Sequence, residues 1–170
     1  MYLIRKATLN DAVLLGNLGA QTFTDAYAAN NTKEDLEVYL NKSFSAAQME
    51  SELKNPHTTY YLCFDGDLAM GYLKLNLHEA CEAFEGDNAI ELQRIYVTKE
   101  YYRKKAGNVL MQFALEQSIQ NAFEYLWLGV WKENYRALAF YQAWGFETIG
   151  ERSFKVGSKI YEDFYLRKKI

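Results

Sequence analysis

The change of hydrophobic period along the chain is the feature that most constrains its fold. Apolar residues follow helical spacing over much of residues 8–55, and strand-like segments rich in Thr, Tyr and Phe begin at Thr58. From Ala106 onwards the pattern is helix, strand, helix and two strands. This order predicts a single α/β domain of the α+β type, with a mixed, mostly antiparallel central sheet flanked by helices.

Local signals place the individual elements. Capping-box patterns at Thr8–Asp11 and Ser45–Gln48 predict helix starts, and Gly145 predicts a helix end. The first helix is expected to bury Val13, Leu14, Leu18 and Phe23. The expected strands are 2–7, 58–64, 68–77, 89–97, 123–131, 146–154 and 159–167, and later helices are expected at 33–40, 45–55, 106–120 and 135–144. The last two strands are expected to form a hairpin that turns at Val156-Gly157-Ser158.

The length of 170 residues fits one compact domain. We expect a domain over residues 1–170, in which 1–57 form a strand and a helical arm and 58–170 carry the sheet. The N-terminus has no secretory pattern, and no apolar run reaches the roughly 20 residues of a membrane span. With two cysteines and a formal charge of −3, the sequence predicts a cytoplasmic protein without membrane or nucleic-acid partners.

Several reaction types lack their motifs in this chain. There is no Walker A loop, G-x-G-x-x-G, G-x-S-x-G or H-E-x-x-H sequence. His57 and His78 are not near a cysteine at metal-ligand spacing, so no metal site is expected. Cys63 and Cys81 have no basic neighbour that would lower a thiol pKa, and we expect both to be packing residues.

Charge is divided unevenly along the chain. Residues 1–100 carry a net charge of −7, and residues 101–170 carry a net charge of +4. Such a division is typical of two ligand surfaces with opposite charge preference. Chance placement on a solvated surface is the alternative.

The first informative region is a strand followed by a basic loop. The strand at Ile90–Val97 leads through a short turn into Arg103-Lys104-Lys105, directly before the helix that begins at Ala106. The first amides of a helix have no partner within the helix, and the helix dipole favours an anion. The arrangement is therefore typical of a phosphate-binding site, although the spacing alone leaves a solvated basic turn open.

The second informative region is Trp131–Phe146. A strand ends at its start, Asn134 takes the N-cap position of an aromatic helix, and the helix ends at Gly145-Phe146. On the residues alone, Asn134 is a helix cap, and Phe140 and Tyr141 are core residues.

Together, these two regions resemble the GCN5-related N-acetyltransferase (GNAT) superfamily. The first contributes the order of strand, basic loop and helix. The second contributes the pattern N-x-x-A-x-x-F-Y-x-x-x-G-F at Asn134–Phe146. The resemblance covers about Leu68–Tyr165. The run Glu91–Val97 and the segment Phe23–Tyr27 resemble the bacterial spermidine/spermine N-acetyltransferase branch. This resemblance implies an acyltransferase that moves an acetyl group from acetyl-CoA, its co-substrate, to a primary amine without a metal.

One loop departs from the superfamily pattern. The pyrophosphate loop there reads Q/R-x-x-G-x-G/A, whereas this chain has Tyr102 in place of Gln or Arg and Lys105 in place of the first Gly. Only Gly107 is kept. A side chain at Lys105 is expected to crowd the phosphate or to require an unusual backbone angle, while its charge adds a contact. The departure keeps a non-catalytic CoA-binding regulatory module as an alternative function.

The resemblance implies two catalytic residues. Glu91 matches the strand glutamate of the superfamily and is expected to remove the proton of the amine, because burial raises a carboxyl pKa. An exposed glutamate on the polar face of the strand is the alternative. Tyr141 matches the general acid that protonates the leaving thiolate, and simple packing is its alternative. Because neither cysteine lies in either motif, direct attack is expected rather than an acetyl-enzyme.

The resemblance also implies the binding residues. Backbone groups of Ile95 and Val97, on a bulged strand, are expected to hold the pantetheine arm, and the loop amides the pyrophosphate. The full cofactor-binding set is Ile95, Tyr96, Val97, Arg103, Lys104, Lys105, Ala106, Gly107, Asn108, Asn134, Ala137 and Phe140.

The acceptor is expected to be a small cationic amine such as a polyamine. Asp25 and Tyr27 lie in the helical arm that forms one wall of the acceptor site in this superfamily, and Glu91 completes the substrate-binding set. The acidic segment Glu79–Asp87 would attract a polycation. A protein N-terminal or lysine acetyltransferase is a further alternative, and dimers are frequent in the superfamily.

Overall fold

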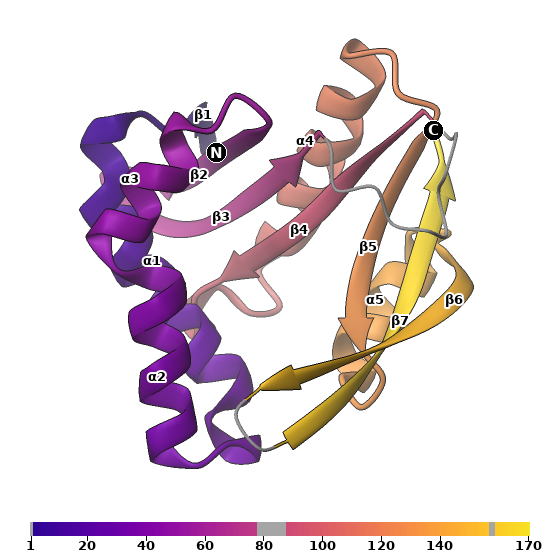
Figure 1. Cartoon of the computed structure of the whole chain (residues 1–170). Coiled ribbons are helices and arrows are strands. Elements are labelled where there is room, and N and C mark those ends of the chain that lie inside the picture. The colour runs from indigo at the N-terminus through magenta and orange to yellow at the C-terminus, as the bar shows by residue number, and fades with distance from the viewer. Residues whose placement is uncertain (1, 78–87, 157–158) are drawn as a thin grey trace. The chain divides into compact units, whose positions relative to one another are not determined.

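The structure, a computed structural model, describes residues 2–77, 88–156 and 159–170 (Figure 1). Its strands are β1 (Leu3–Lys6), β2 (Thr58–Asp65), β3 (Leu68–Asn76), β4 (Ala89–Val97), β5 (Tyr125–Trp131), β6 (Glu147–Val156) and β7 (Lys159–Lys169). Its α-helices are α1 (Ala12–Tyr27), α2 (Lys33–Phe44), α3 (Ala46–Lys54), α4 (Ala106–Gln120) and α5 (Tyr135–Ala143). The predicted element order is confirmed. The expected turn at Gly157-Ser158 and the acidic segment Glu79–Asp87 lie outside the described residues.

The strands hydrogen-bond in the order β1-β2-β3-β4-β5-β7-β6. The β4–β5 pair is parallel, whereas the β1–β2, β5–β7 and β6–β7 pairs are antiparallel. The predicted mixed, mostly antiparallel sheet is therefore confirmed.

The chain divides into two compact units. The first unit comprises Met1–Leu75 and Arg94–Ala114, and the second comprises Asn76–Gln93 and Leu115–Ile170. The strand β4 and the helix α4 each contribute residues to both units.

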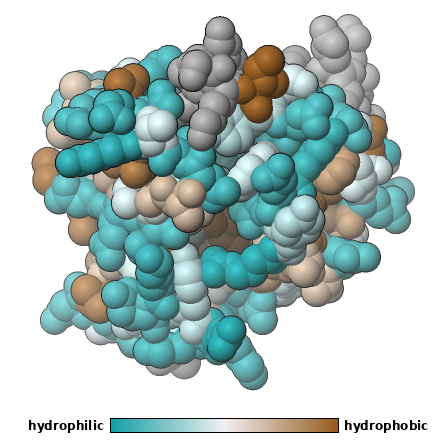
Figure 2. All heavy atoms as spheres, turned by 90° about the horizontal axis from the view of Figure 1, so that it is seen from below, coloured by the Kyte–Doolittle hydropathy of each residue, from teal (hydrophilic) through white to brown (hydrophobic). Residues whose placement is uncertain are grey.

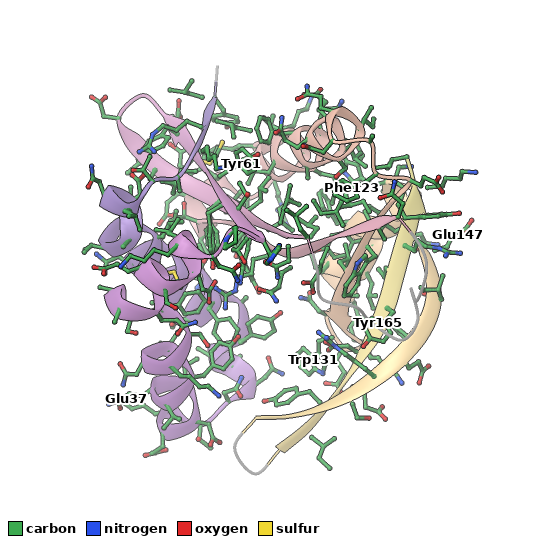
Figure 3. All side chains as sticks on the ribbon, turned by 45° about the horizontal axis from the view of Figure 1, so that its top comes forward. Glu37, Tyr61, Phe123, Trp131, Glu147 and Tyr165 are labelled. Carbon is green, nitrogen blue, oxygen red and sulfur yellow. The ribbon has the colours of Figure 1, made fainter. Side chains whose placement is uncertain are left out.

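In the first unit, α1, α2 and α3 pack together beside β2 and β3 (Figure 1). On the same strands, the Tyr61 side chain turns towards α4 and meets Phe113 at 4.8 Å between ring centroids (Figure 3). Buried side chains between the helices and the sheet form one apolar cluster, which includes Leu15, Leu18, Phe44, Met49, Tyr60, Leu62 and Tyr72.

The buried face of α1 differs from the prediction. Leu18 is buried as expected, but Val13 is 62% exposed and Leu14 is 36% exposed, so the prediction for these two residues is wrong. The buried side chains instead lie at Ala12, Leu15, Leu18 and Thr22, with spacings of three and four residues. The contacts of Asp11, which directly precedes α1, determine which side of the helix is buried.

The start of α1 is fixed by an ion pair. The Arg5 guanidinium lies 2.7 Å from the Asp11 carboxylate, which also accepts the Thr8 backbone N–H at 2.7 Å. The hydrogen bond from Arg5 holds the pKa of Asp11 well below its usual range. This capping box, which the sequence predicted, opens a 3₁₀ turn at Leu9–Asp11 that leads directly into α1. It ties that turn to β1 and so decides which side of α1 faces the sheet.

The absence of a side chain at Gly71 lets β3 approach the end of β4. A Cβ atom on Gly71 would lie 2.7 Å from the Tyr96 carbonyl oxygen and 2.9 Å from the Val97 side chain. The adjacent Thr98 N–H donates to the Met70 carbonyl at 2.9 Å. Only glycine fits at this position without moving the backbone of β4.

A charged network lies between α3 and the sheet of the first unit. The Glu52 carboxylate lies 2.6 Å from Lys74 Nζ and accepts the Tyr60 hydroxyl at 2.5 Å and the Gln48 amide at 2.9 Å. Burial raises the pKa of Glu52, but Lys74 and the hydrogen bonds together lower it by more than burial raises it. The pKa of Glu52 is therefore below its usual value. Glu52 is therefore ionised and compensates the charge of Lys74, which is buried.

In the second unit, the two faces of β5 differ. Leu126, Leu128 and Val130 form a buried apolar face. Trp127, Gly129 and Trp131 point to the other side, where β7 places Asp163 and Tyr165 opposite them. The side chains of Trp131 and Tyr165 can be followed on this face in Figure 3. The strand is buried on both faces over Leu126–Leu128, since each of these residues is at most 3% exposed.

Hydrophilic residues predominate on the face of the molecule in Figure 2, and hydrophobic residues there are scattered. Among the described helices, none combines the length and the hydropathy that a membrane span needs.

We predict that Glu52→Gln destabilises the protein by about 3–5 kcal/mol at pH 7, because it leaves the buried Lys74 without its counter-charge. Since the folded-state pKa of Glu52 is lowered, its contribution is fully present above the unfolded-state pKa of about 4.3. That contribution disappears as the pH falls through the folded-state pKa, and the variant should lack it at every pH. Urea unfolding at a series of pH values measures both effects. Equal stability of the two proteins at pH 7 would contradict the assignment.

Candidate functional site

The basic loop between β4 and α4 has an unusual backbone. After a 3₁₀ turn at Lys99–Tyr101, Arg103 and Lys105 adopt left-handed conformations with φ of 64° and 63°. Such angles are uncommon for residues other than glycine. The unusual backbone angle predicted for Lys105 is therefore confirmed. Lys105 directly precedes α4, as the corresponding glycine of the loop pattern would.

Two tyrosines, Tyr2 and Tyr101, contact Lys104 in this loop. The Tyr2 hydroxyl donates to the Lys104 carbonyl at 3.2 Å, and the Tyr101 ring lies 4.8 Å from Lys104 Nζ. The Tyr101 hydroxyl in turn donates to Asp65 at 3.0 Å, and this hydrogen bond raises the pKa of Tyr101. Sequence reasoning missed Tyr2 and Tyr101, because their role depends on contacts between residues far apart in the chain.

The loop offers donors for an anion. Arg103, Lys104 and Lys105 are exposed, and the helical bonding of α4 is under way at Val109, whose N–H donates to the Lys105 carbonyl at 3.1 Å. The amides of the first turn, at Ala106–Asn108, precede this bond and lie where a helix N-terminus attracts negative charge. Three exposed cations beside a helix start fit a pyrophosphate group.

The adjoining residues of β4 are half-buried. Ile95, Tyr96 and Val97 are all partly accessible, and the Tyr96 ring lies 5.8 Å from that of Tyr72. Burial raises the pKa of Tyr96 well above its usual value. Its phenol is therefore neutral and belongs to the aromatic interior, so any contact of Tyr96 with a ligand would come from its backbone.

The two predicted acceptor residues of the helical arm both have partners within the first unit. The Asp25 carboxylate lies 3.0 Å from Lys99 Nζ, at the 3₁₀ turn that precedes the basic loop. The Tyr27 ring packs against Phe23 at 4.6 Å. No sequence pattern indicated a role for Lys99, whose pairing with Asp25 places a cation beside this predicted acceptor residue.

In the second unit, Glu91 is buried. It is 3% exposed, and it accepts a hydrogen bond from the Asn76 amide at 2.9 Å. The exposed glutamate that the sequence left open is therefore excluded. The parallel register of β4 with β5 joins Ala89–Glu91 to Tyr125–Trp127, which sets Glu91 beside Trp127 on the aromatic face of β5.

Asn134 caps α5, as its position in the sequence indicated. Its side-chain oxygen accepts the Ala137 N–H at 3.2 Å, and its carbonyl accepts the Leu138 N–H at 2.9 Å. Phe140 packs edge-on against Tyr141, with ring centroids 5.5 Å apart. The predicted binding residues Asn134, Ala137 and Phe140 thus lie on one short helix, where they also have structural roles.

The end of α5 explains why Tyr141, Gly145 and Phe146 recur in the pattern. The Phe146 N–H donates to the Tyr141 carbonyl at 3.1 Å, the Gly145 N–H donates to the Gln142 carbonyl at 2.9 Å, and Gly145 has φ of 78°. These are the hydrogen bonds of a Schellman motif. The Tyr141 ring also meets Phe146 edge-on at 5.7 Å, so Tyr141 packs at the helix end while staying half-buried.

The candidate residues therefore fall into two groups. The first unit holds Asp25, Tyr27, Ile95–Val97 and Arg103–Asn108, and the second holds Glu91 and the α5 residues. Within the described residues there is no group of three or more potential metal ligands. Burial raises the pKa of Cys63 to about 11, in agreement with a packing role.

Comparison with known proteins gives the family. Residues 21–146 match the model of the acetyltransferase (GNAT) family. An uncharacterized N-acetyltransferase of Lactobacillus delbrueckii subsp. lactis, from the pepI 3′ region, is 32% identical over 154 residues, which cover 90% of this chain and 88% of the relative. The chain belongs to the GNAT family and is an N-acetyltransferase, with acetyl-CoA as the acetyl donor.

More distant relatives show the same fold. The spermidine N(1)-acetyltransferase of Thermoplasma acidophilum is 24% identical, with 98% of this chain and 96% of that protein covered. The crystal structure of the PaiA N-acetyltransferase of Thermoplasma acidophilum in complex with coenzyme A has a TM-score of 0.81 at 23% identity, over 100% of this chain and 99% of that one.

We predict that Lys105→Gly raises the free energy of unfolding by about 1 kcal/mol, because glycine adopts the left-handed conformation without steric cost. Lys105→Ala is the matched control, since it removes the same charge and keeps the unfavourable backbone angle. Chemical unfolding of the three proteins measures the difference. Equal stability of the Gly and Ala variants would show that the loop holds no strain at this position.

At the end of α5, we expect Gly145→Ala to lower the free energy of unfolding by about 1–2 kcal/mol, since alanine is disfavoured at φ of 78°. Gly150→Ala serves as the comparison, because its added Cβ would meet the Tyr165 ring at an ordinary 3.6 Å. Thermal unfolding of both variants would reveal the difference. A Gly145 variant as stable as the Gly150 variant would contradict the Schellman assignment.

Proposed function

We propose that this protein transfers the acetyl group of acetyl-CoA directly to the primary amine of a small cationic molecule, with polyamines as the first class of acceptor to test. The observation that carries the proposal is the left-handed basic loop at the start of α4, where exposed cations surround a helix N-terminus. The left-handed angle at Lys105 supports a working loop, because it keeps the backbone path that glycine usually supplies.

The donor side of the reaction rests on backbone groups. In this proposal the amides of Arg103–Asn108 bind the pyrophosphate, and Ile95 and Val97 hold the pantetheine arm. The side chains of Arg103 and Lys105 add charge-assisted contacts to the phosphates. Asn134 contributes to binding of the CoA chain through its side-chain amide, whose oxygen also caps α5.

The chemical step needs a base, because a primary amine with a pKa near 10 is protonated at neutral pH. Glu91 is the proposed base, and its burial beside Trp127 supports this role. The Asn76 amide orients the carboxylate by donating to one of its oxygens. Tyr141 is the proposed acid that protonates the departing thiolate, and its half-buried phenol at the end of α5 is compatible with that role.

The polyamine acceptor has two supports. A spermidine N(1)-acetyltransferase is among the relatives, at 24% identity. The segment Glu79–Asp87 is rich in acidic residues. We further propose a cytoplasmic location and a homodimer, which fractionation and size-exclusion chromatography test.

The proposal predicts thiol release from acetyl-CoA with at least one amine in a panel of polyamines, aminoglycosides, amino acids and N-terminal peptides. Activity confined to peptides would favour a protein acetyltransferase instead. If a folded protein that binds CoA released no thiol with any amine of the panel, the result would indicate a regulatory module.

Within an active protein, Tyr141→Phe should lower turnover by about 100-fold with little change in CoA affinity, as expected for loss of a general acid. Glu91→Gln should lower turnover by a similar factor and remove the acidic limb of the pH profile, which reports the protonation of a general base. Tyr135→Phe, on an exposed position of the same helix, is the control and should keep full activity. Wild-type turnover in the Tyr141 variant would remove that residue from the mechanism.

A further inference from the structure

Arg94 is a half-buried cation that forms no direct ion pair with a described carboxylate. It lies on β4 with its guanidinium carbon 4.6 Å from the centre of the Phe44 ring, and its Nη1 donates to the Tyr60 hydroxyl at 3.1 Å. The side chain is half-buried. In the part of the chain that the structure describes, no carboxylate lies within ion-pair distance of this guanidinium.

The nearby carboxylate is already used. Glu52 is connected to Arg94 through the Tyr60 hydroxyl, which donates to Glu52 while it accepts from Arg94. Glu52 also pairs with Lys74 at 2.6 Å. Two cations therefore share one carboxylate, and this cluster carries an excess positive charge in a poorly solvated place.

Such an arrangement is costly without a ligand. Removing a cation from water is unfavourable unless an opposite charge compensates it, and most enclosed arginines are paired. The guanidinium has five N–H groups in a planar fork that matches the oxygens of a carboxylate or a phosphate. Within the described residues, only one of those N–H groups of Arg94 is engaged by a protein acceptor.

We propose that Arg94 is the centre of a binding site for an oxyanion group, a carboxylate or a phosphate, in the first unit. The ligand supplies the negative charge that the cluster lacks, and its oxygens accept from the guanidinium N–H groups that Tyr60 does not engage. If the acceptor supplies this group, a point that rests on the proposed function, the enzyme acts on an amine that also carries an acid, such as an amino acid. A separate small anion is the other source of the same chemistry.

The first arm of the test compares acceptors that differ only in a carboxylate. Lysine is measured against cadaverine, and ornithine against putrescine, as kcat/KM in the thiol-release assay. If the acceptor supplies the anion, the wild-type protein prefers the amino acid by about tenfold or more, the effect of a charge-assisted hydrogen bond. Arg94→Gln should reduce this ratio to near one. Lys54→Gln, which removes an exposed cation from the same unit, should keep it.

The second arm detects a separate anion without relying on activity. Thermal unfolding is followed with inorganic phosphate or with glutarate, against sodium chloride of equal ionic strength. The proposal predicts that either anion raises the melting temperature of the wild-type and Lys54→Gln proteins, and that Arg94→Gln loses this response. Without added anion, Arg94→Gln should be at least as stable as the wild-type protein, because it removes an uncompensated cation.

The outcomes separate the possibilities. A carboxylate preference assigns the anion to the acceptor, and an anion-dependent melting temperature without that preference assigns it to a separate ligand. Neither effect, with Arg94→Gln clearly less stable than the wild-type protein, would overturn the proposal and make Arg94 a structural partner of Tyr60. An anion-dependent melting temperature in a protein that acetylates no amine would leave this site standing and remove only the proposed acetyl transfer.

Discussion

The path of β4 is the constraint on which the rest of the molecule depends. In the second unit its first residues pair with β5 and bury Glu91, and in the first unit its last residues lie against β3 where Gly71 has no side chain. The strand then releases the chain into the basic loop. One strand therefore supplies the proposed base, the proposed pantetheine contacts and the entry to the phosphate site, so a change in its register would displace all three.

The loop after β4 shows that backbone conformation, rather than a particular residue, is what the site requires. Lys105 stands at the first glycine of the loop pattern that the sequence resembles, and it nonetheless adopts the left-handed angle that glycine favours. Tyr2 and Tyr101 hold the neighbouring segment in place and so help to stabilise this conformation. The backbone strain at Lys105 is offset by the contacts of Tyr2 and Tyr101, two residues that are not part of the family pattern.

The sequence predicted the elements and the two informative regions well, because both depend on local chemistry. Capping residues, the glycine at the end of α5 and the basic run before α4 act within a few positions of one another. The buried face of α1 was predicted wrongly at Val13 and Leu14, since the pair between Arg5 and Asp11 sets the helix start from outside the helix. The surroundings of Arg94 could not be predicted, because they join residues 34 positions apart.

The central claim is that acetyl-CoA binds to backbone amides at the end of β4 and the start of α4. Backbone amide chemical shifts, recorded while CoA is added to the ¹⁵N-labelled protein, test it most directly. The account predicts the largest shifts at Ile95–Val97 and Arg103–Asn108, and a much weaker response in the loop to pantetheine, which lacks the pyrophosphate. Saturating CoA that leaves the amides of Arg103–Asn108 unshifted would contradict it.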